Sequence, residues 1–261
     1  MDFQYKDAYN ISDLVRIMHI LRAPDGCPWD RVQTHESIRQ NFIEETYEAV
    51  EAIDNGDSAL LREELGDVLM QVIFHAIMEE EEGRFTFDDV CNDVCQKLII
   101  RHPHVFGNIE ADTPDEVLKN WDAIKMQTKS QETYADSVDD VAKSLPALMR
   151  AQKVQKRSAK SGMDFKDAAD AASKVPEEQQ ELLAAVKSGD KERIEEELGD
   201  LLFSVVNIAR FVGVDAELAL TRSTEKFSRR FRAVEALAKE RGVDMKTAPT
   251  SLIDSLWEEI K

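Results

Sequence analysis

Apolar residues recur at the spacing of one helix face in two similar parts of the chain. In residues 61–76 they are Leu65, Val68, Leu69, Val72, Ile73 and Ala76, and in residues 194–209 they are Leu198, Leu201, Leu202, Val205, Val206 and Ala209. Alternating steps of three residues and one residue follow one side of an α-helix, whereas a half-buried strand would alternate every second residue. Both segments are therefore predicted to be amphipathic helices.

Further helices are predicted around each of these segments. Residues 41–53 read as a helix that ends at the turn sequence NGD (55–57), and the second segment has SGD (188–190) at the matching place. Residues 87–100 and 216–241 are predicted to form a third helix in each part, and Pro146 is expected to start a helix in its first turn. The pattern predicts an all-α fold of helical hairpins arranged like four-helix bundles.

The two halves of the chain repeat each other. LREELGDVLMQVIFHA (61–76) matches IEEELGDLLFSVVNIA (194–209), and EETYEAV (44–50) matches EEQQELL (177–183) at the same offset. This tandem duplication predicts an N-terminal domain over residues 1–126, a polar linker over 127–145 and a C-terminal domain over 146–261. Because one hairpin cannot bury its apolar face alone, we expect hairpins to pair, in a homodimer.

Composition and charge exclude several classes of protein. Ten glycines and seven prolines in 261 residues are too few turn formers for an all-β fold. The formal net charge of −19 would repel a phosphate backbone, so nucleic acid is not an expected partner. We find no apolar run long enough for a membrane span and no signal peptide. Three cysteines, an odd number, favour reduced thiols and a cytoplasmic location.

Each predicted hairpin brings four carboxylates together, two from each helix. Their spacing of three residues places each pair on one helix face, and the pairs of a hairpin lie at equal distances from its turn. The first set is Glu45, Glu48, Glu64 and Asp67, and the second is Glu178, Glu181, Glu197 and Asp200. Four ionised carboxylates at one place repel one another unless a hard cation lies between them.

These carboxylates favour a particular kind of metal. Di-iron bundles use Glu-x-x-His on two helices, and no histidine stands three residues after any of these acids. Ligation by oxygen alone favours Mg²⁺, with Mn²⁺ as the alternative. Acidic pairs also occur as ordinary solvated surface on Glu-rich helices, but level pairs on two helices in two copies favour a metal site.

Several blocks of the sequence closely resemble the MazG family of nucleoside triphosphate pyrophosphohydrolases. They are the paired blocks given above, together with GCPWDRVQTHESI (26–38), RHPHVFG (101–107) and EKFSRRF (225–231). The resemblance covers nearly the whole chain. It implies Mg²⁺-dependent hydrolysis of a nucleoside triphosphate to the monophosphate and pyrophosphate, with clearance of nucleotide pools as a candidate role.

The resemblance also implies roles for individual residues. The metal motif of the family falls on both sets of four carboxylates, and catalysis is implied for Glu178, Glu181, Glu197 and Asp200. Its phosphate-contacting segment falls on Lys226, Arg229 and Arg230, and Trp257 is the expected nucleobase or sugar contact. The matching positions of the first copy are Lys97, Arg101, Trp121 and Lys125. A spare carboxylate, Glu177 or Glu44, is available to orient water.

Two functions of different class remain open. One is the metal-dependent pyrophosphohydrolase, and the other is a non-catalytic helical module that binds metal-nucleotide as a sensor or docks a partner. The copies themselves differ, because the first has Pro103 after Arg101, which must end or bend the helix, whereas the second continues its basic helix through Arg232. We therefore expect hydrolysis in the second copy.

Overall fold

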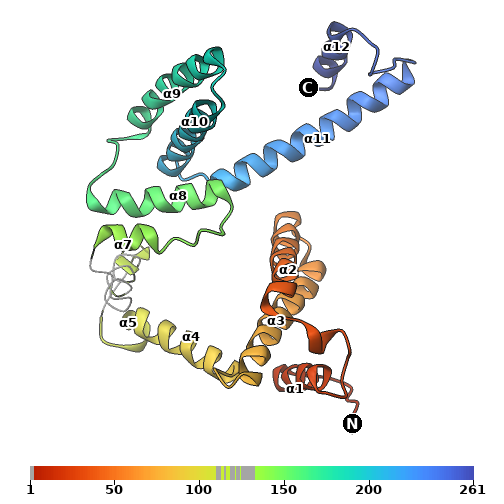
Figure 1. The fold of residues 1–261 in the computed structure, drawn as a ribbon, viewed down its shortest axis with the longest axis vertical. Helices are drawn as coiled ribbons and strands as arrows, with labels where there is room; N and C mark the ends of the chain where they lie inside the picture. The colour runs from red at the N-terminus through yellow and green to blue at the C-terminus, as the bar shows by residue number, and fades with distance from the viewer. Residues whose placement is uncertain (1–2, 110–112, 115, 118–120, 122–123, 125–132) are drawn as a thin grey trace. The chain divides into compact units, whose positions relative to one another are not determined.

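The computed structural model describes residues 3–109, 113–114, 116–117, 121, 124 and 133–261 (Figure 1). All regular structure in these residues is helical, which confirms the predicted all-α class. By its internal contacts the chain divides into two compact units, Met1–Ile124 and Lys125–Lys261. Each unit is described by itself.

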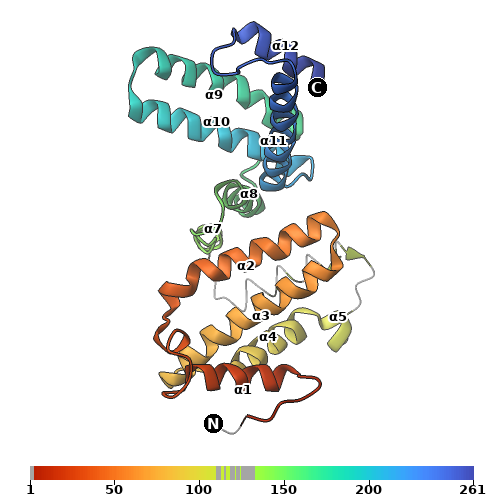
Figure 2. The ribbon, with the colours of Figure 1, turned by 90° about the vertical axis from the view of Figure 1, so that its right-hand side faces the viewer.

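The first unit is built around one helical hairpin. Its elements are α1 (Ile11–Arg22), the short 3₁₀ helix η1 (Asp30–Val32), α2 (His35–Asn55), α3 (Ser58–Glu81), α4 (Phe87–Arg101) and α5 (Pro103–Phe106). Helices α2 and α3 lie side by side and antiparallel, while α1 and α4 contact α3 (Figure 2). The predicted helices are all present, and α2 begins six residues before the predicted start at residue 41.

The second unit contains the matching hairpin. Its elements are α7 (Tyr134–Asp139), α8 (Ala147–Ser158), η2 (Ala159–Ser161), α9 (Ala168–Ser188), α10 (Lys191–Phe211), α11 (Ala216–Glu240) and α12 (Thr250–Ile260). Helices α9 and α10 pair along their length, α8 packs on α10, and α12 packs on α11. Helix α7 lies inside the segment predicted as a linker and contacts α8. The predicted domain limits stay a prediction.

The turns of the two hairpins are built in the same way. Gly56 ends α2 at a φ of +66° and Gly189 ends α9 at +73°, a left-handed backbone that suits glycine. The next residue, Asp57 or Asp190, accepts hydrogen bonds from the first amides of the following helix. These turns set which residues of the two helices stand level with each other.

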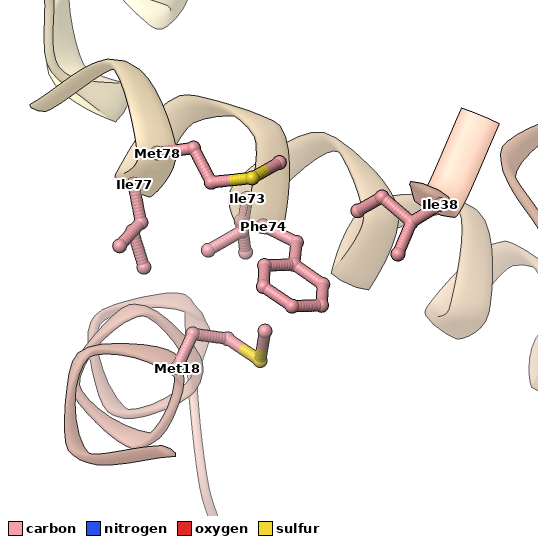
Figure 3. Close-up of a cluster of buried hydrophobic side chains, with 6 residues drawn as sticks. All are labelled: Met18, Ile38, Ile73, Phe74, Ile77 and Met78. Atoms are coloured by element: carbon pink, nitrogen blue, oxygen red, sulfur yellow. The ribbon is translucent and has the colours of Figure 1, made fainter. Parts of the chain in front are cut away.

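The core of the first unit lies between α1 and the later turns of α3. Figure 3 shows its buried side chains, which are Met18, Ile38, Ile73, Phe74, Ile77 and Met78. Burying a side chain of this size contributes roughly 1.5–3 kcal/mol to stability. The cluster therefore anchors α1 and the start of α2 on α3.

The second unit does not repeat this core. In the repeat, Asn207 takes the place of Phe74 and Arg210 that of Ile77. Arg210 donates from Nε to the Asn207 side-chain oxygen at 2.9 Å and also pairs with Asp164. Here the helices border a cavity of about 390 Å³ instead of a packed cluster. A cluster of buried apolar side chains of this unit lies between α11 and α12, at Val234, Ala238 and Leu256.

Apolar side chains stay exposed on one face of each hairpin. Leu65 of α3 is 54% exposed, and Leu198 and Leu202 of α10 are 45% and 47% exposed. The predicted apolar faces are thus only partly covered within each unit. In the part of the chain that the structure describes, we find no helix with the length and apolar character needed to cross a membrane.

Candidate metal centres

Four acidic side chains converge on the α2–α3 hairpin. Glu45, Glu48 and Glu64 each offer an oxygen, and these oxygens all lie within 4.8 Å of one another. Asp67 lies close enough for its charge to act on both Glu45 and Glu64. The first predicted set of carboxylates, which we call the first cage, is therefore brought together by the fold.

The electrostatics of the first cage favour a bound cation. Burial raises the pKa of Glu45, and the charge of Asp67 raises it further. Burial likewise raises the pKa of Glu64, whose side chain is almost fully covered, and the charge of Glu48 adds to the effect. The charges of Glu48 and Asp67 thus make ionisation of Glu45 and Glu64 harder, and a divalent cation between these groups would remove that cost.

The second cage has the same composition, but a different set of three carboxylates converges in it. Oxygens of Glu178, Glu197 and Asp200 lie within 4.8 Å of one another. Burial raises the pKa of Glu181, and the charges of Glu197 and then Glu178 raise it further, so Glu181 lies near both of these acids. All eight predicted metal ligands therefore belong to two acidic clusters, one in each unit.

The donor set fits a hard divalent cation. Every donor is a carboxylate oxygen, the ligand that Mg²⁺ and Mn²⁺ prefer. Opposite oxygens around one Mg²⁺ at 2.0–2.1 Å lie about 4.2 Å apart. The spread of up to 4.8 Å in each cage needs only small side-chain adjustments to reach that geometry.

Two basic side chains contact the second cage, and sequence analysis did not single them out. Lys174 Nζ lies 3.3 Å from a carboxylate oxygen of Glu178 and 2.8 Å from one of Glu177. Arg193 reaches Glu197 with 3.6 Å between nitrogen and oxygen. Lys174 precedes Glu178 by four residues on α9, and Arg193 precedes Glu197 by four residues on α10. This spacing in the sequence is the signal that could have predicted both ion pairs.

The basic residues predicted for the second site lie on α11. Lys226 and Arg229 are exposed, while Arg230 is half-buried and donates to the backbone oxygen of Lys261 at 3.3 Å. Trp257 of α12 packs against Phe227, with 5.4 Å between ring centres. Within the described residues, no hydrogen bond or ion pair joins these groups to the second cage.

The matching groups of the first unit are arranged differently. Helix α4 ends at Arg101, as expected from Pro103, and the guanidinium of Arg101 lies over the Trp121 ring at 5.6 Å from its centre. His102 meets the same ring edge-on, with 4.8 Å between ring centres. Lys97 is exposed on α4, and Lys125 lies outside the described residues.

A histidine cluster in the first unit has no counterpart in the predictions. His35 and His75 stack with their Nδ1 atoms 2.7 Å apart, so one of the two nitrogens donates to the other. The second nitrogen of His35 lies 2.7 Å from a Glu79 oxygen. Hydrogen bonds from Arg84 and then His35 lower the pKa of Glu79 to about 2. His35 lies 40 positions before His75 and 44 positions before Glu79 along the chain.

Both cages lie within segments that match a known protein family. A family described as the MazG nucleotide pyrophosphohydrolase domain matches residues 33–106 and 169–235, and each match contains one cage. The chain is 45% identical over 254 residues to the nucleoside triphosphate pyrophosphohydrolase of Escherichia coli strain K12, covering 96% of this chain and 97% of that protein. It is 44% identical over 249 residues to the nucleoside triphosphate pyrophosphohydrolase/pyrophosphatase MazG of Thermotoga maritima, covering 95% and 94% of the two chains.

Proposed function

This chain belongs to the MazG family of nucleoside triphosphate pyrophosphohydrolases, and we propose that it hydrolyses a nucleoside triphosphate to the monophosphate and pyrophosphate at the second cage. The observation that carries the proposal is the convergence of Glu178, Glu197 and Asp200 within a segment that matches the family. We infer that clearance of unwanted nucleotides is its role in the cell.

We infer that Mg²⁺ is the resident cofactor, with Mn²⁺ as a substitute. Glu178, Glu181, Glu197 and Asp200 would hold it in the second unit, and Glu45, Glu48, Glu64 and Asp67 in the first. When bound, a divalent cation would neutralise phosphate charge and activate a water for in-line attack.

Basic side chains of the second unit would bind the phosphates. Lys226 and Arg230 stand one helical turn apart on α11 and share a face, so both can meet one triphosphate. Arg229 lies beside them. Lys174 and Arg193 already reach the cage acids and are half-exposed, so they are free to turn toward phosphate oxygens.

Two further groups would complete the site. Trp257 offers a planar surface for the nucleobase or the sugar. Glu177 is placed next to Glu178 on α9, where its carboxylate can accept a hydrogen bond from the attacking water and so orient it. Glu44 is its counterpart in the first unit.

We propose that the first unit binds or regulates more than it catalyses. Its phosphate-binding set would comprise Lys97, Arg101, Trp121 and Lys125. Arg101 and Trp121 are already occupied with each other, and α4 stops where α11 continues. A triphosphate would therefore meet a smaller basic surface here than in the second unit.

We infer that the protein is a homodimer and acts in the cytoplasm. Exposed Leu198, Leu202 and Val205 on α10 form an apolar face that a second hairpin would cover. The free thiols of Cys27, Cys91 and Cys95 suit a reducing compartment, where nucleotides are also found.

Product analysis tests the proposed function. Full-length protein with Mg²⁺ and a panel of nucleoside triphosphates is expected to release pyrophosphate and the monophosphate in equal amounts, with no diphosphate intermediate. Stepwise release of orthophosphate would contradict the proposal. Nucleotide binding without any product would instead favour the non-catalytic sensor.

A further inference from the structure

The two cages can be compared position by position. Helices α2 and α9 are both 21 residues long and end at equivalent glycines, and α3 and α10 both begin directly after the capping aspartate. In this alignment Asn41 stands where α9 has Lys174, and Leu60 stands where α10 has Arg193. The acids are therefore the same in both cages, while the two basic neighbours occur only in the second.

The ion pairs follow this difference. In the second cage, Lys174 contacts Glu178 at 3.3 Å and Arg193 contacts Glu197 at 3.6 Å. Among the residues that the structure describes, no basic side chain forms an ion pair with any acid of the first cage. Oxygens of three of its carboxylates lie within 4.8 Å of one another, and among the described residues no ion pair balances their charge.

We propose that the two cages take up their cations differently: in nucleotide-free protein the first binds a divalent cation tightly and the second binds one only weakly, because Lys174 and Arg193 occupy its carboxylates until a triphosphate draws them away. The second half of this statement rests on the proposed function. The first half concerns metal affinity alone and stands independently of it.

Charge accounts for both halves. An ammonium or guanidinium group beside two of the four ligands repels a divalent cation and competes for the same oxygens. Both basic side chains are about half-exposed, at 39% for Lys174 and 55% for Arg193, so their pairs are weak and exchangeable. A triphosphate offers them stronger partners and leaves the acids to the cation. Nucleotide and metal then strengthen each other's binding by the same factor.

The first cage acquires a distinct role from this difference. A cation held without nucleotide would join Glu45 and Glu48 of α2 to Glu64 and Asp67 of α3, across the turn at Gly56. Because the unfolded chain lacks this site, the cation stabilises the folded first unit. The first cage is then a resident structural site, and the second is filled in each catalytic cycle.

The first experiment titrates full-length, nucleotide-free protein with Mn²⁺ and follows free Mn²⁺ by electron paramagnetic resonance. Wild type is expected to show a tight class of sites and a class at least about tenfold weaker. Glu64→Gln should remove the tight class, and Glu197→Gln should leave it unchanged. Equal affinities in wild type, or loss of the tight class in Glu197→Gln, would overturn the proposal.

Exchange variants test the two basic residues directly. The double variant Lys174→Asn and Arg193→Leu should tighten the weak class by about tenfold, and the reverse variant Asn41→Lys and Leu60→Arg should weaken the tight class by about as much. The conservative pair Lys174→Arg and Arg193→Lys should behave like wild type. Tightening in the conservative pair as well would show that charge is not the cause. Thermal melts of each variant identify any folding defect.

The nucleotide arm uses an equimolar mixture of the four α,β-methylene ribonucleoside triphosphates, so that base preference does not decide the outcome. In equilibrium dialysis at a free Mn²⁺ concentration that fills only the tight class, adding the mixture should raise protein-bound Mn²⁺ in wild type but hardly in Glu197→Gln. No rise in wild type would overturn the coupled loading. Absence of pyrophosphate release from natural triphosphates would instead refute the proposed function, and the nucleotide-free titration would still report on the cages.

Discussion

The guanidinium carbon of Arg101 lies 5.6 Å from the centre of the Trp121 ring, so the two groups predicted to bind nucleotide in the first unit stack on each other. The equivalent residues of the second unit make other contacts: Trp257 packs on Phe227, and Arg230 donates to the backbone oxygen of Lys261. Such a cation–π pair is worth about 0.5–1 kcal/mol at an exposed site and about 2 kcal/mol when desolvated, and Arg101 is half-buried with its Nε covered. A nucleotide would have to displace it in the first unit only.

This contrast predicts different effects of removing the two tryptophans. Trp257→Ala should raise the KM for nucleoside triphosphates by about tenfold, since it removes a stacking surface worth about 1–3 kcal/mol. Trp121→Ala should leave both kcat and KM within about twofold of wild type. Steady-state kinetics on pyrophosphate release checks both variants. Equal effects of the two substitutions would contradict the assignment of substrate binding to the second unit.

The cage carboxylates should not be equivalent in catalysis. Glu178→Gln or Asp200→Asn is expected to lower turnover at least about a hundredfold, because each removes a charged metal ligand. The matched changes in the first cage, Glu45→Gln and Asp67→Asn, should lower turnover far less. Rates of pyrophosphate release at saturating Mg²⁺ test this prediction. If the first-cage variants are the inactive ones, the first cage and not the second is the catalytic site.

Activity should depend on the divalent cation supplied. Chelation is expected to abolish pyrophosphate release, and Mg²⁺ or Mn²⁺ should restore it. Ca²⁺ should restore it poorly, because it takes more ligands at longer distances than four carboxylates provide. Rates after dialysis against chelator and readdition of each ion give the answer. Full turnover in chelator would rule out the metal cages.

The exposed apolar face of α10 predicts a dimer. Leu198 and Leu202 are 45% and 47% exposed, and paired hairpins would bury them. Multi-angle light scattering at micromolar concentration should therefore give twice the 29.6 kDa chain mass. The double variant Leu198→Glu and Leu202→Glu should shift the mass toward the monomer, while Met163→Glu, at an exposed residue of the loop before α9, should not. A monomeric wild type would refute the pairing.

The stability of metal-free protein should depend on pH through the first cage. Burial and the charge of Glu48 raise the pKa of Glu64 above its ordinary 4.5, so the folded state binds the proton more readily than the unfolded chain. The favourable contribution of Glu64 to the free energy of unfolding is fully present below pH 4.5. It is lost as the pH rises through the raised pKa of Glu64 in the folded state. In chelator, Glu64→Gln should therefore melt above wild type at neutral pH, and the difference should shrink as the pH falls toward 4.5.

Metal provides the control for this prediction. With saturating Mg²⁺ at neutral pH the order should reverse, because wild type then gains the binding free energy of a cation that Glu64→Gln holds less well. Melting temperatures by circular dichroism across the pH series measure both effects. If the difference in melting temperature between Glu64→Gln and wild type in chelator does not change with pH, the pKa of Glu64 is not raised by burial and neighbouring charge.

The helices and the cages were determined largely by the sequence. The apolar spacing in residues 61–76 and 194–209 is a local property of the chain, and helix length follows from it together with the glycine turns at Gly56 and Gly189. Once the turn is placed, equal distances along two antiparallel helices bring Glu48 level with Glu64. The convergence of the carboxylates therefore needed only helical geometry and the repeat.

Other features were decided by tertiary structure alone. The stack of His35 on His75, and of Arg101 on Trp121, joins residues far apart in the chain, and no local spacing predicts that they meet. Helix α7 begins at a local capping box of Thr133 and Asp136, but its packing on α8 is a tertiary contact that the polar segment does not predict. The sequence places Asn207 and Arg210 where the first unit has core residues, but only the packing of the loop at Asp164 against α10 gives Arg210 its ion-pair partner. Periodicity fixes which way a side chain faces, whereas the partner it meets depends on how the helices pack.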